Sequence, residues 1–396
     1  MIKRKVLENG MTVVFKERKN GVVAVAFAVR FGGLNEKIEH KGIAHFIEHM
    51  LYKGTTKRSS RDISMEIERN GGELNGFTSE QATAFWCKMP ARHIDVALDV
   101  LSDMVKNPLF DSSEVEKERQ VIFEEMKMYR DNPRMHVFDK IKALLYKGDF
   151  SLSIIGTEES MKSNSRDRLK EFFERVYVPE NMILCVSGEA DFDKICEFAE
   201  KNFEKKGDKI YYPEVVESNG EEIEKRKGID QANLVLAHHV PLGKEYESII
   251  LNALLAGGMS SRLFSEIREK RNLAYAVKGF SDNEGKFAYN GVYVGTTSEN
   301  VEIVKKLILE EFEKVSEELE EVELESVKEQ VLGNYFISQE DSFSVLYELL
   351  RAEIKGDVKD IEKFIDKIRA VKVEDVKTLA KLKDWSFFAL VPEDNR

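Results

Sequence analysis

Two histidines four positions apart, His45 and His49, enclose a glutamate, Glu48, which directly precedes the second of them. Apolar residues recur at helical spacing between Gly42 and Gly54, and this pattern predicts one buried helix. Side chains at i and i+4 share one face of a helix, so the two imidazoles can bind a single Zn²⁺ ion at about 2.0–2.1 Å per bond. Glu48 lies beside them, where its carboxylate can accept a proton from a metal-bound water.

The order His-x-x-Glu-His reverses the commoner His-Glu-x-x-His zinc motif and matches the inverted zincin signature. With seven histidines in a glutamate-rich chain, such a match also arises by chance. The alternative is a pair of hydrogen-bonded helix histidines beside an exposed glutamate, and the pentapeptide alone does not exclude it.

A catalytic zinc site needs a third protein ligand and one open position, and residues 112–130 supply candidates. They predict a long helix whose inward stripe holds Glu118 and Glu125 among apolar side chains. Glutamate is rarely buried without a partner, so a cation should face this stripe. We expect Glu125 to be the third zinc ligand and Glu118 to orient a ligand histidine. A salt bridge to a lysine or arginine is the alternative for both.

Together these residues resemble the motif of the zinc peptidase family that contains pitrilysin, insulin-degrading enzyme and the mitochondrial processing peptidase. The likeness includes the surrounding text, GIAHFIEHMLYKGT and ERQVIFEEMKMYRDNP, and extends over nearly the whole chain. The resemblance implies that His45, His49 and Glu125 bind one zinc ion per chain and that Glu48 is the catalytic base. The implied reaction is hydrolysis of extended peptides or short unfolded polypeptides by zinc-bound water.

The resemblance also implies three substrate-binding residues. The segment after the double glycine at 71–72 should form a strand at an exposed sheet edge. A substrate peptide would pair with this edge as an extra strand, and Asn75 would help to hold it. Arg268 and Tyr275 match an arginine and a tyrosine that this family brings from its second half to the zinc. The resemblance implies that Tyr275 binds the substrate or the oxyanion and that Arg268 contacts the peptide. From the residues alone, Asn75 can equally shape a turn, and Arg268 can be an exposed helix cation.

The sequence around these candidate residues contains an internal repeat. SSRDISMEIERNGGELNGF, starting at Ser59, resembles SSRLFSEIREKRNLAYAVKGF, starting at Ser260. Each follows an apolar helix and leads into a strand and then a long amphipathic helix, which indicates a duplicated unit. The second apolar helix, at 245–256, has no histidine. The duplication therefore predicts a single metal site, in the first copy.

From this repeat we expect an N-terminal zinc-binding catalytic domain at 1–207, a polar linker at 208–227, and a homologous domain without a metal site at 228–396. Neither half shows the regular βαβ rhythm of a parallel sheet. The predicted fold class is therefore α+β, with each domain a mainly antiparallel sheet that has helices packed on one face. A single helix is expected at 322–356.

The composition is that of a globular protein, with 42% hydrophobic and 33% charged residues. A net charge of −12 argues against a nucleic-acid partner. Three cysteines in apolar surroundings are expected to be buried free thiols of a reducing compartment. We find no signal peptide and no membrane span in the sequence, so the predicted location is the cytoplasm.

Larger relatives of the resembled family carry four such domains, which form a closable chamber. Two domains here imply that a second chain completes it, as a homodimer or as a heterodimer with a zinc-less paralogue. Two other functions stay open: a non-catalytic or partner-dependent subunit of a processing-peptidase-like complex, and a zinc hydrolase of a non-peptide substrate. The intact motif disfavours the non-catalytic or partner-dependent subunit, and the expected edge strand around Asn75 disfavours the hydrolase of a non-peptide substrate.

Overall fold

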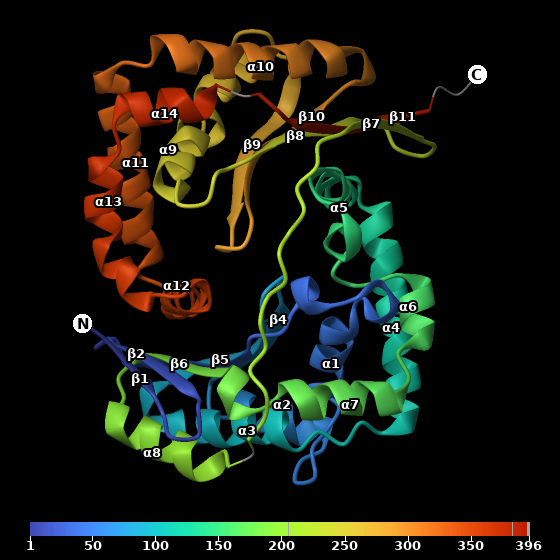
Figure 1. The fold of residues 1–396 in the computed structure, drawn as a ribbon, viewed down its shortest axis with the longest axis vertical. Coiled ribbons are helices and arrows are strands. Elements are labelled where there is room, and N and C mark those ends of the chain that lie inside the picture. Colours follow the sequence, from blue (N-terminus) through green and yellow to red (C-terminus); the bar gives the residue numbers. More distant parts are fainter. Residues whose placement is uncertain (205, 382, 394–396) are drawn as a thin grey trace. The chain divides into compact units, whose positions relative to one another are not determined.

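The computed structural model describes residues 1–204, 206–381 and 383–393, which form two compact units, each built around one β-sheet (Figure 1). The first unit comprises Met1–Met126, Leu152–Pro213 and Ser338–Ile361. The second comprises Lys127–Ser151, Glu214–Ile337 and Glu362–Arg396. Each unit therefore includes a segment from the other half of the chain.

The first sheet has six strands in the order β1-β2-β6-β3-β5-β4, and every neighbouring pair is antiparallel except β2 and β6. Its strands are β1 Ile2–Val6, β2 Thr12–Glu17, β3 Val22–Val29, β4 Glu73–Thr78, β5 Thr83–Pro90 and β6 Met182–Gly188. The helices that begin in this unit are α1 Ile43–Leu51, α2 Ser60–Glu68, α3 Ile94–Lys106, α4 Ser112–Asp131, α6 Glu158–Ser163, α7 Arg166–Val176, α8 Phe192–Asn202 and α12 Ser342–Lys355.

The central strand β3 shows how this sheet is buried on both faces. Its larger side chains, among them Val25 and Phe27, join the main core with α1 and α3. The alternate positions are Ala24, Ala26 and Ala28, and they face α12 on the opposite side. Successive side chains of a strand point to opposite faces, so the small residues form the surface on which α12 packs closely.

The second sheet has five strands in the order β7-β11-β8-β10-β9, with only β7 and β11 parallel. Its strands are β7 Glu221–Arg226, β8 Ala232–His239, β9 Ala274–Asn283, β10 Ala288–Thr296 and β11 Ser386–Pro392. The helices of this unit are α5 Pro133–Leu145, α9 Glu245–Ala256, α10 Val301–Glu318, α11 Glu321–Ser338, α13 Phe364–Ala370 and α14 Val373–Ala380.

The two sheets share one topology, which confirms the predicted duplication. In chain order, β7, β8, β9, β10 and β11 take the same places as β2, β3, β4, β5 and β6, including the one parallel pair. The helices α5 and α12 also correspond, since each follows the long helix of its own half. They are exchanged between the units: α5 packs on β8 and β11, and α12 packs on β6 and β3 (Figure 1).

The predicted α+β class with mainly antiparallel sheets is confirmed, but the expectation of helices on one face was incomplete because the exchanged helix covers the other face. The contiguous ranges 1–207 and 228–396 miss this exchange. The predicted linker, 208–227, is also corrected, because it contains β7, which pairs with β11. The sequence of β7, EEIEKR, belongs to a largely exposed edge strand, so it lacks the apolar alternation that predicts a strand.

Cys87, Cys185 and Cys196 are buried and unpaired, as the sequence predicted. Among the described residues, no helix combines the length and apolar character needed to cross a bilayer.

A buried carboxylate fastens α12 to the first sheet. Glu353 is almost fully buried, and its oxygens lie 2.7 Å from Arg4 Nε and 2.9 Å from Arg30 Nη2. On the same helix, Phe343 packs against Trp86 in a tilted arrangement, with 4.1 Å between ring centroids. The fluorescence of Trp86 should therefore report whether α12 is docked.

We predict that Glu353→Ala destabilises the first unit by on the order of 3 kcal/mol, because it removes the carboxylate that pairs with Arg4 and Arg30. The measurement is urea unfolding followed by Trp86 fluorescence, in a Trp385→Phe background. Glu340→Gln, an exposed position just before α12, is the control. An unchanged urea midpoint for Glu353→Ala would show that the ion pairs do not hold the helix.

Candidate active site

The helix α1 carries both histidines and Glu48 on nine residues, and its apolar side chains fix its orientation. The side chains that it buries in the core of the first unit are Ile43, Phe46, Ile47, Met50 and Leu51. His45 and His49 occupy the remaining face, where they meet α4. The predicted helix is confirmed, and the i, i+4 spacing places the two imidazoles one turn apart.

The N-terminus of α1 is held by a buried side chain from the preceding loop. Glu36 accepts hydrogen bonds from the backbone N–H groups of Gly42, at 2.9 Å, and Ala44, at 2.8 Å. Lys41 Nζ lies 3.7 Å from this carboxylate and donates to the carbonyl of Gly33 at 2.6 Å. Burial raises the pKa of Glu36, while Lys41 and the two backbone donors oppose this shift. The cap satisfies N–H groups that every helix N-terminus leaves open.

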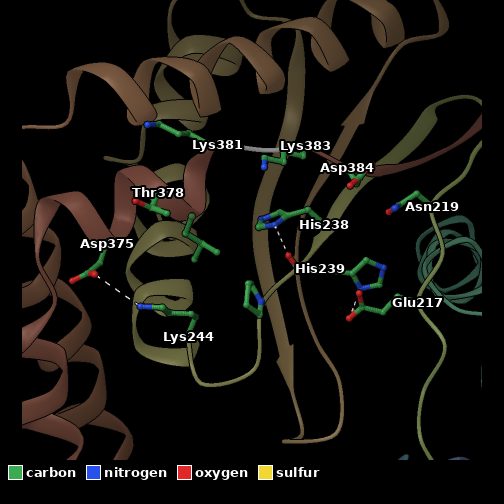
Figure 2. Close-up of a pocket in the computed structure, with 12 residues that line it drawn as sticks. Glu217, Asn219, His238, His239, Lys244, Asp375, Thr378, Lys381, Lys383 and Asp384 are labelled. Atoms are coloured by element: carbon green, nitrogen blue, oxygen red, sulfur yellow. Dashed lines mark hydrogen bonds and ion pairs between the residues drawn. The ribbon is translucent and has the colours of Figure 1, made fainter.

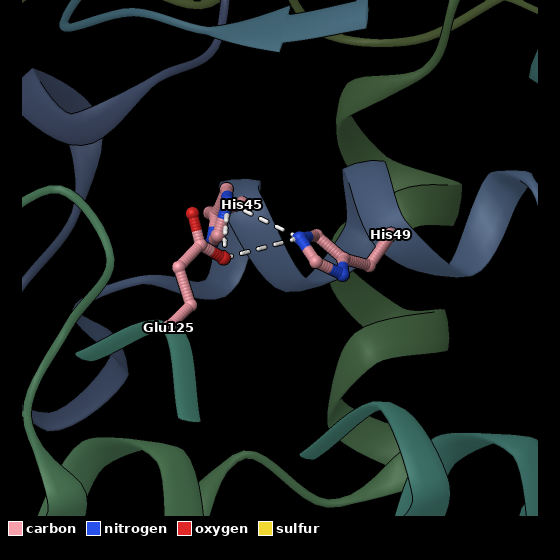
Figure 3. A group of neighbouring side chains, drawn as sticks. All are labelled: His45, His49 and Glu125. Carbon is pink, nitrogen blue, oxygen red and sulfur yellow. Dashed lines mark hydrogen bonds and ion pairs between the residues drawn. The ribbon is translucent and has the colours of Figure 1, made fainter. Parts of the chain in front are cut away.

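Three side chains from α1 and α4 converge at one point (Figure 3). His45 Nε2 and His49 Nε2 lie 3.3 Å apart, and Glu125 Oε2 lies 3.6 Å from each of them. Ligand atoms about 2.0–2.1 Å from a tetrahedral zinc are separated by roughly 3.3–3.4 Å from one another. The observed separations match this requirement closely, so the three residues fit a zinc ion.

The same side chains are partly exposed, at 11% for His45, 21% for His49 and 23% for Glu125. A fully enclosed group would suit a structural metal, whereas a catalytic metal keeps one position open to water or substrate. The exposure therefore favours the catalytic kind of site. Among the described residues, this is the one cluster of three or more histidine, cysteine or carboxylate side chains with metal-binding spacing.

Glu118 makes both of the contacts that the sequence left as alternatives. Its Oε2 lies 3.0 Å from His49 Nδ1, and its Oε1 lies 2.6 Å from Lys53 Nζ. The N–H at Nδ1 can donate to this carboxylate, which leaves Nε2 of His49 free to bind a metal. His45 Nδ1, by contrast, is buried and has no hydrogen-bond partner among the described residues.

Glu48 lies on the side of α1 that faces strand β4. Its Oε2 accepts a hydrogen bond from the hydroxyl of Thr78, the last residue of β4. Gly76, on the same strand, lies very close to α1 and to Tyr52, which follows it. A Cβ at this position would lie 2.6 Å from the Tyr52 hydroxyl and 3.3 Å from Glu48 Oε1. The hydroxyl of Tyr52 is buried and has no hydrogen-bond partner among the described residues.

The surroundings shift the pKa values of these groups in different directions. Burial raises the pKa of Glu48, and the Thr78 hydroxyl opposes this shift. Burial, reinforced by the neighbouring His49, lowers the pKa of His45 to about 4. Burial also acts to lower the pKa of His49, but the carboxylates of Glu125 and Glu118 outweigh it and the pKa is raised. Before a metal binds, one imidazole is therefore readily neutral and the other is stabilised as a cation.

The predicted substrate residue Asn75 lies within β4, the edge strand of the first sheet, so it does not shape a turn. Its side chain is exposed, and Oδ1 accepts a hydrogen bond from the N–H of Gly76 at 2.8 Å. The free edge beside it is the feature expected of a strand that receives a peptide.

Arg268 and Tyr275 belong to the second unit, and their role toward a metal site stays a prediction. Arg268 is exposed on a π-helical turn, Phe264–Glu269, with its guanidinium 5.0 Å from the centroid of Phe264. Tyr275 lies at a bulge in the pairing of β9 with β10, and it is 46% exposed. Both π-turns and bulges recur at functional sites.

A pocket lies in the second unit, where residues of β8 meet α14 and the segment after it (Figure 2). His238 and His239 line it, but the two histidines form separate contacts. His238 Nδ1 lies 3.1 Å from the carbonyl of His239, and His239 Nε2 lies 3.0 Å from the carbonyl of Ser218. These backbone contacts agree with the structural role that adjacent strand histidines should have.

The sequence did not indicate Lys53, Thr78 or Glu36. Lys53 falls just after α1 and Thr78 ends an edge strand, and nothing in their local spacing shows that they meet carboxylates of other elements. Glu36, six residues before Gly42, lies outside the usual positions of a helix cap.

Two family models match this chain. One is described as insulinase (peptidase family M16) and covers residues 12–158, which include His45, Glu48, His49 and Glu125. The other is described as the peptidase M16 inactive domain and covers residues 163–331. YmxG of Bacillus subtilis, named an uncharacterized zinc protease, is 33% identical over 409 residues, covering 100% of this chain and 99% of the relative.

Solved structures show the same fold. A protease from Helicobacter pylori superposes with a TM-score of 0.91 at 24% identity, covering 99% of each chain. A peptidase M16 inactive domain from Pseudomonas fluorescens superposes with a TM-score of 0.91 at 17% identity, covering 100% of this chain and 98% of that one. With both halves matched and one relative similar along its entire length, this chain belongs to peptidase family M16.

Proposed function

We propose that this protein is a zinc-dependent endopeptidase that hydrolyses extended peptides or short unfolded polypeptides. The observation that carries the proposal is the convergence of His45, His49 and Glu125 at zinc-binding separations, with Glu48 on the same helix. Relatives named zinc proteases support a peptidase role.

The proposed reaction divides the work among the residues of α1 and α4. His45, His49 and Glu125 would hold a zinc ion, which would supply Lewis-acid chemistry: it would lower the pKa of a bound water toward ~7 and polarise the peptide carbonyl. Glu48 accepts the proton of the attacking water and delivers it to the leaving amine. Burial raises the pKa of Glu48, which makes its carboxylate a stronger base than an exposed glutamate.

The proposed substrate position is the free edge of β4. An extended peptide that pairs there would bind through main-chain hydrogen bonds, which makes recognition largely indifferent to side chains. Asn75 is exposed on this strand and is assigned to peptide contact. From the family resemblance, Arg268 is proposed to contact the peptide, and Tyr275 is proposed to hydrogen-bond the substrate or the tetrahedral oxyanion.

The alternative of a non-catalytic or partner-dependent subunit predicts an inactive chain on its own. The site does not favour this alternative, because the three expected ligands His45, His49 and Glu125 lie together and the expected base, Glu48, is also present. The predicted dimer, with itself or with a zinc-less paralogue, stays a prediction. The alternative of a zinc hydrolase acting on a non-peptide substrate does not account for the open edge of β4, which suits pairing with a peptide strand.

We predict that Glu48→Gln retains zinc but loses peptide cleavage by at least about 100-fold, because the ligands survive and the base does not. The measurement is mass spectrometry of an unstructured peptide mixture incubated with wild type or variant, with zinc content measured in parallel. Equal cleavage by both would remove Glu48 from the mechanism. No cleavage by either would contradict the proposal for the isolated chain.

We predict that His45→Ala and Glu125→Gln each lower zinc content, because each removes one of three ligands. Atomic emission on dialysed protein gives the zinc content directly. Glu124→Gln, the position next to Glu125 on α4, is the matched control. Full zinc occupancy in both ligand variants would exclude them as ligands.

We predict that Glu118→Gln weakens zinc binding by roughly 10–100-fold without abolishing it, because the residue orients His49 rather than binding the metal. Titration against a competing chelator measures the affinity. A loss as complete as in His45→Ala would instead make Glu118 a direct ligand, and an unchanged affinity would show that its contact with His49 is dispensable.

A further inference from the structure

We propose that Thr78 is a positioning residue that fixes the orientation of Glu48 and ties it to the strand expected to receive the peptide. This inference rests on the proposed peptidase function, in which Glu48 is the base. The spacing of the chain did not indicate Thr78, whose contact with Glu48 is shown by the structure at the end of β4.

The hydrogen bonds of Glu48 distinguish its two carboxylate oxygens. Oε2 accepts from the hydroxyl of Thr78, and the structure shows no partner for Oε1 among the described residues. A glutamate side chain loses rotamer freedom when it is ordered, and a donor on one oxygen removes the rotation that would exchange the two. One oxygen is therefore held, and the other is left available for proton transfer.

Successive side chains of β4 point to opposite faces of the strand, and the two faces make different contacts. Gly76 and Thr78 share the face toward α1, where Gly76 has room only for a hydrogen beside Tyr52 and Glu48. Phe77 lies on the opposite face and packs against Tyr347 of α12, with 5.3 Å between ring centroids. The strand is thus anchored on one side while it contacts the base on the other.

The same strand has one edge paired with β5 and the other edge free. A peptide that adds to the free edge takes its register from the backbone of β4. Because Thr78 belongs to that backbone and holds Glu48, one element sets both the register of the peptide and the position of the base. Displacing a catalytic group by about 1 Å can cost 10²-fold in rate, so this shared support has a measurable consequence.

The test compares Thr78→Val, which keeps the shape and removes the hydroxyl, with Thr78→Ser, which keeps the hydroxyl. We expect Thr78→Val to lower kcat by about 10–100-fold with KM within about 2-fold of wild type. We expect Thr78→Ser to retain kcat within about 3-fold of wild type, because its hydroxyl can make the same bond. Zinc content should not change in either variant.

Thr83→Val is the matched control. Thr83 pairs directly with Thr78 across β4 and β5, but its hydroxyl donates to the carbonyl of Phe31 at 2.9 Å and does not meet Glu48. This variant loses a comparable hydrogen bond, so it measures the purely structural cost of the substitution. Peptide affinity, measured by fluorescence anisotropy in the Glu48→Gln background, should be unaffected by Thr78→Val, because the variant alters the base and not the docking edge.

The inference is overturned if Thr78→Val turns over like wild type, if Thr78→Ser loses as much kcat as Thr78→Val, or if Thr83→Val shows the same loss. A fall in peptide affinity with unchanged kcat would also overturn it, since Thr78 would then serve binding. If Thr78→Val does not fold, Thr78→Ala, which also removes the hydroxyl, replaces it in the comparison with Thr78→Ser. Failure of the proposed function is distinct, because wild type itself would then show no cleavage.

Discussion

The site depends on one constraint: two metal ligands and a base must keep fixed positions on a helix of only nine residues. A helix of this length is not stable by its own hydrogen bonds. Its order comes from its surroundings, which bury its apolar face, cap its first N–H groups with Glu36, and place α4 and β4 against its polar side. Much of the first unit can be understood as the support of this short element.

The second unit shows that the fold does not require the metal. It repeats the strand order of the first unit, and α9 takes the place of α1 without any histidine. Helix and sheet packing alone therefore stabilise this topology, and the metal ligands are an addition to one copy of it. The exchange of α5 and α12 means that neither half of the chain completes its own sheet face, so the two halves of the duplicated chain should depend on each other for stability.

Spacing and periodicity predicted the features that lie within one element: α1 with its histidine pair, α4 with two carboxylates on its inward stripe, and the repeat. They could not show that α5 and α12 change units, because an amphipathic helix indicates that a face is buried but not against which sheet. The helix expected at 322–356 is divided into α11 and α12 by Asp341, an N-cap with no glycine or proline near it. The histidine contact of Glu118 was predicted, but the identity of its lysine partner, Lys53, was not, and neither was the contact of Thr78 with Glu48, since both form through tertiary structure.

Three glutamates in this small region differ in what surrounds them, and the differences separate their roles. Glu125 faces two imidazoles, and its contact with His49 lowers the pKa of its carboxyl, which favours the ionised form that a metal ligand needs. Glu118 is fixed between His49 and Lys53, so both of its oxygens are already engaged. Glu48 alone combines burial, a raised pKa and one oxygen without a partner among the described residues. Of the three, only Glu48 can exchange a proton without breaking a contact that holds the site together.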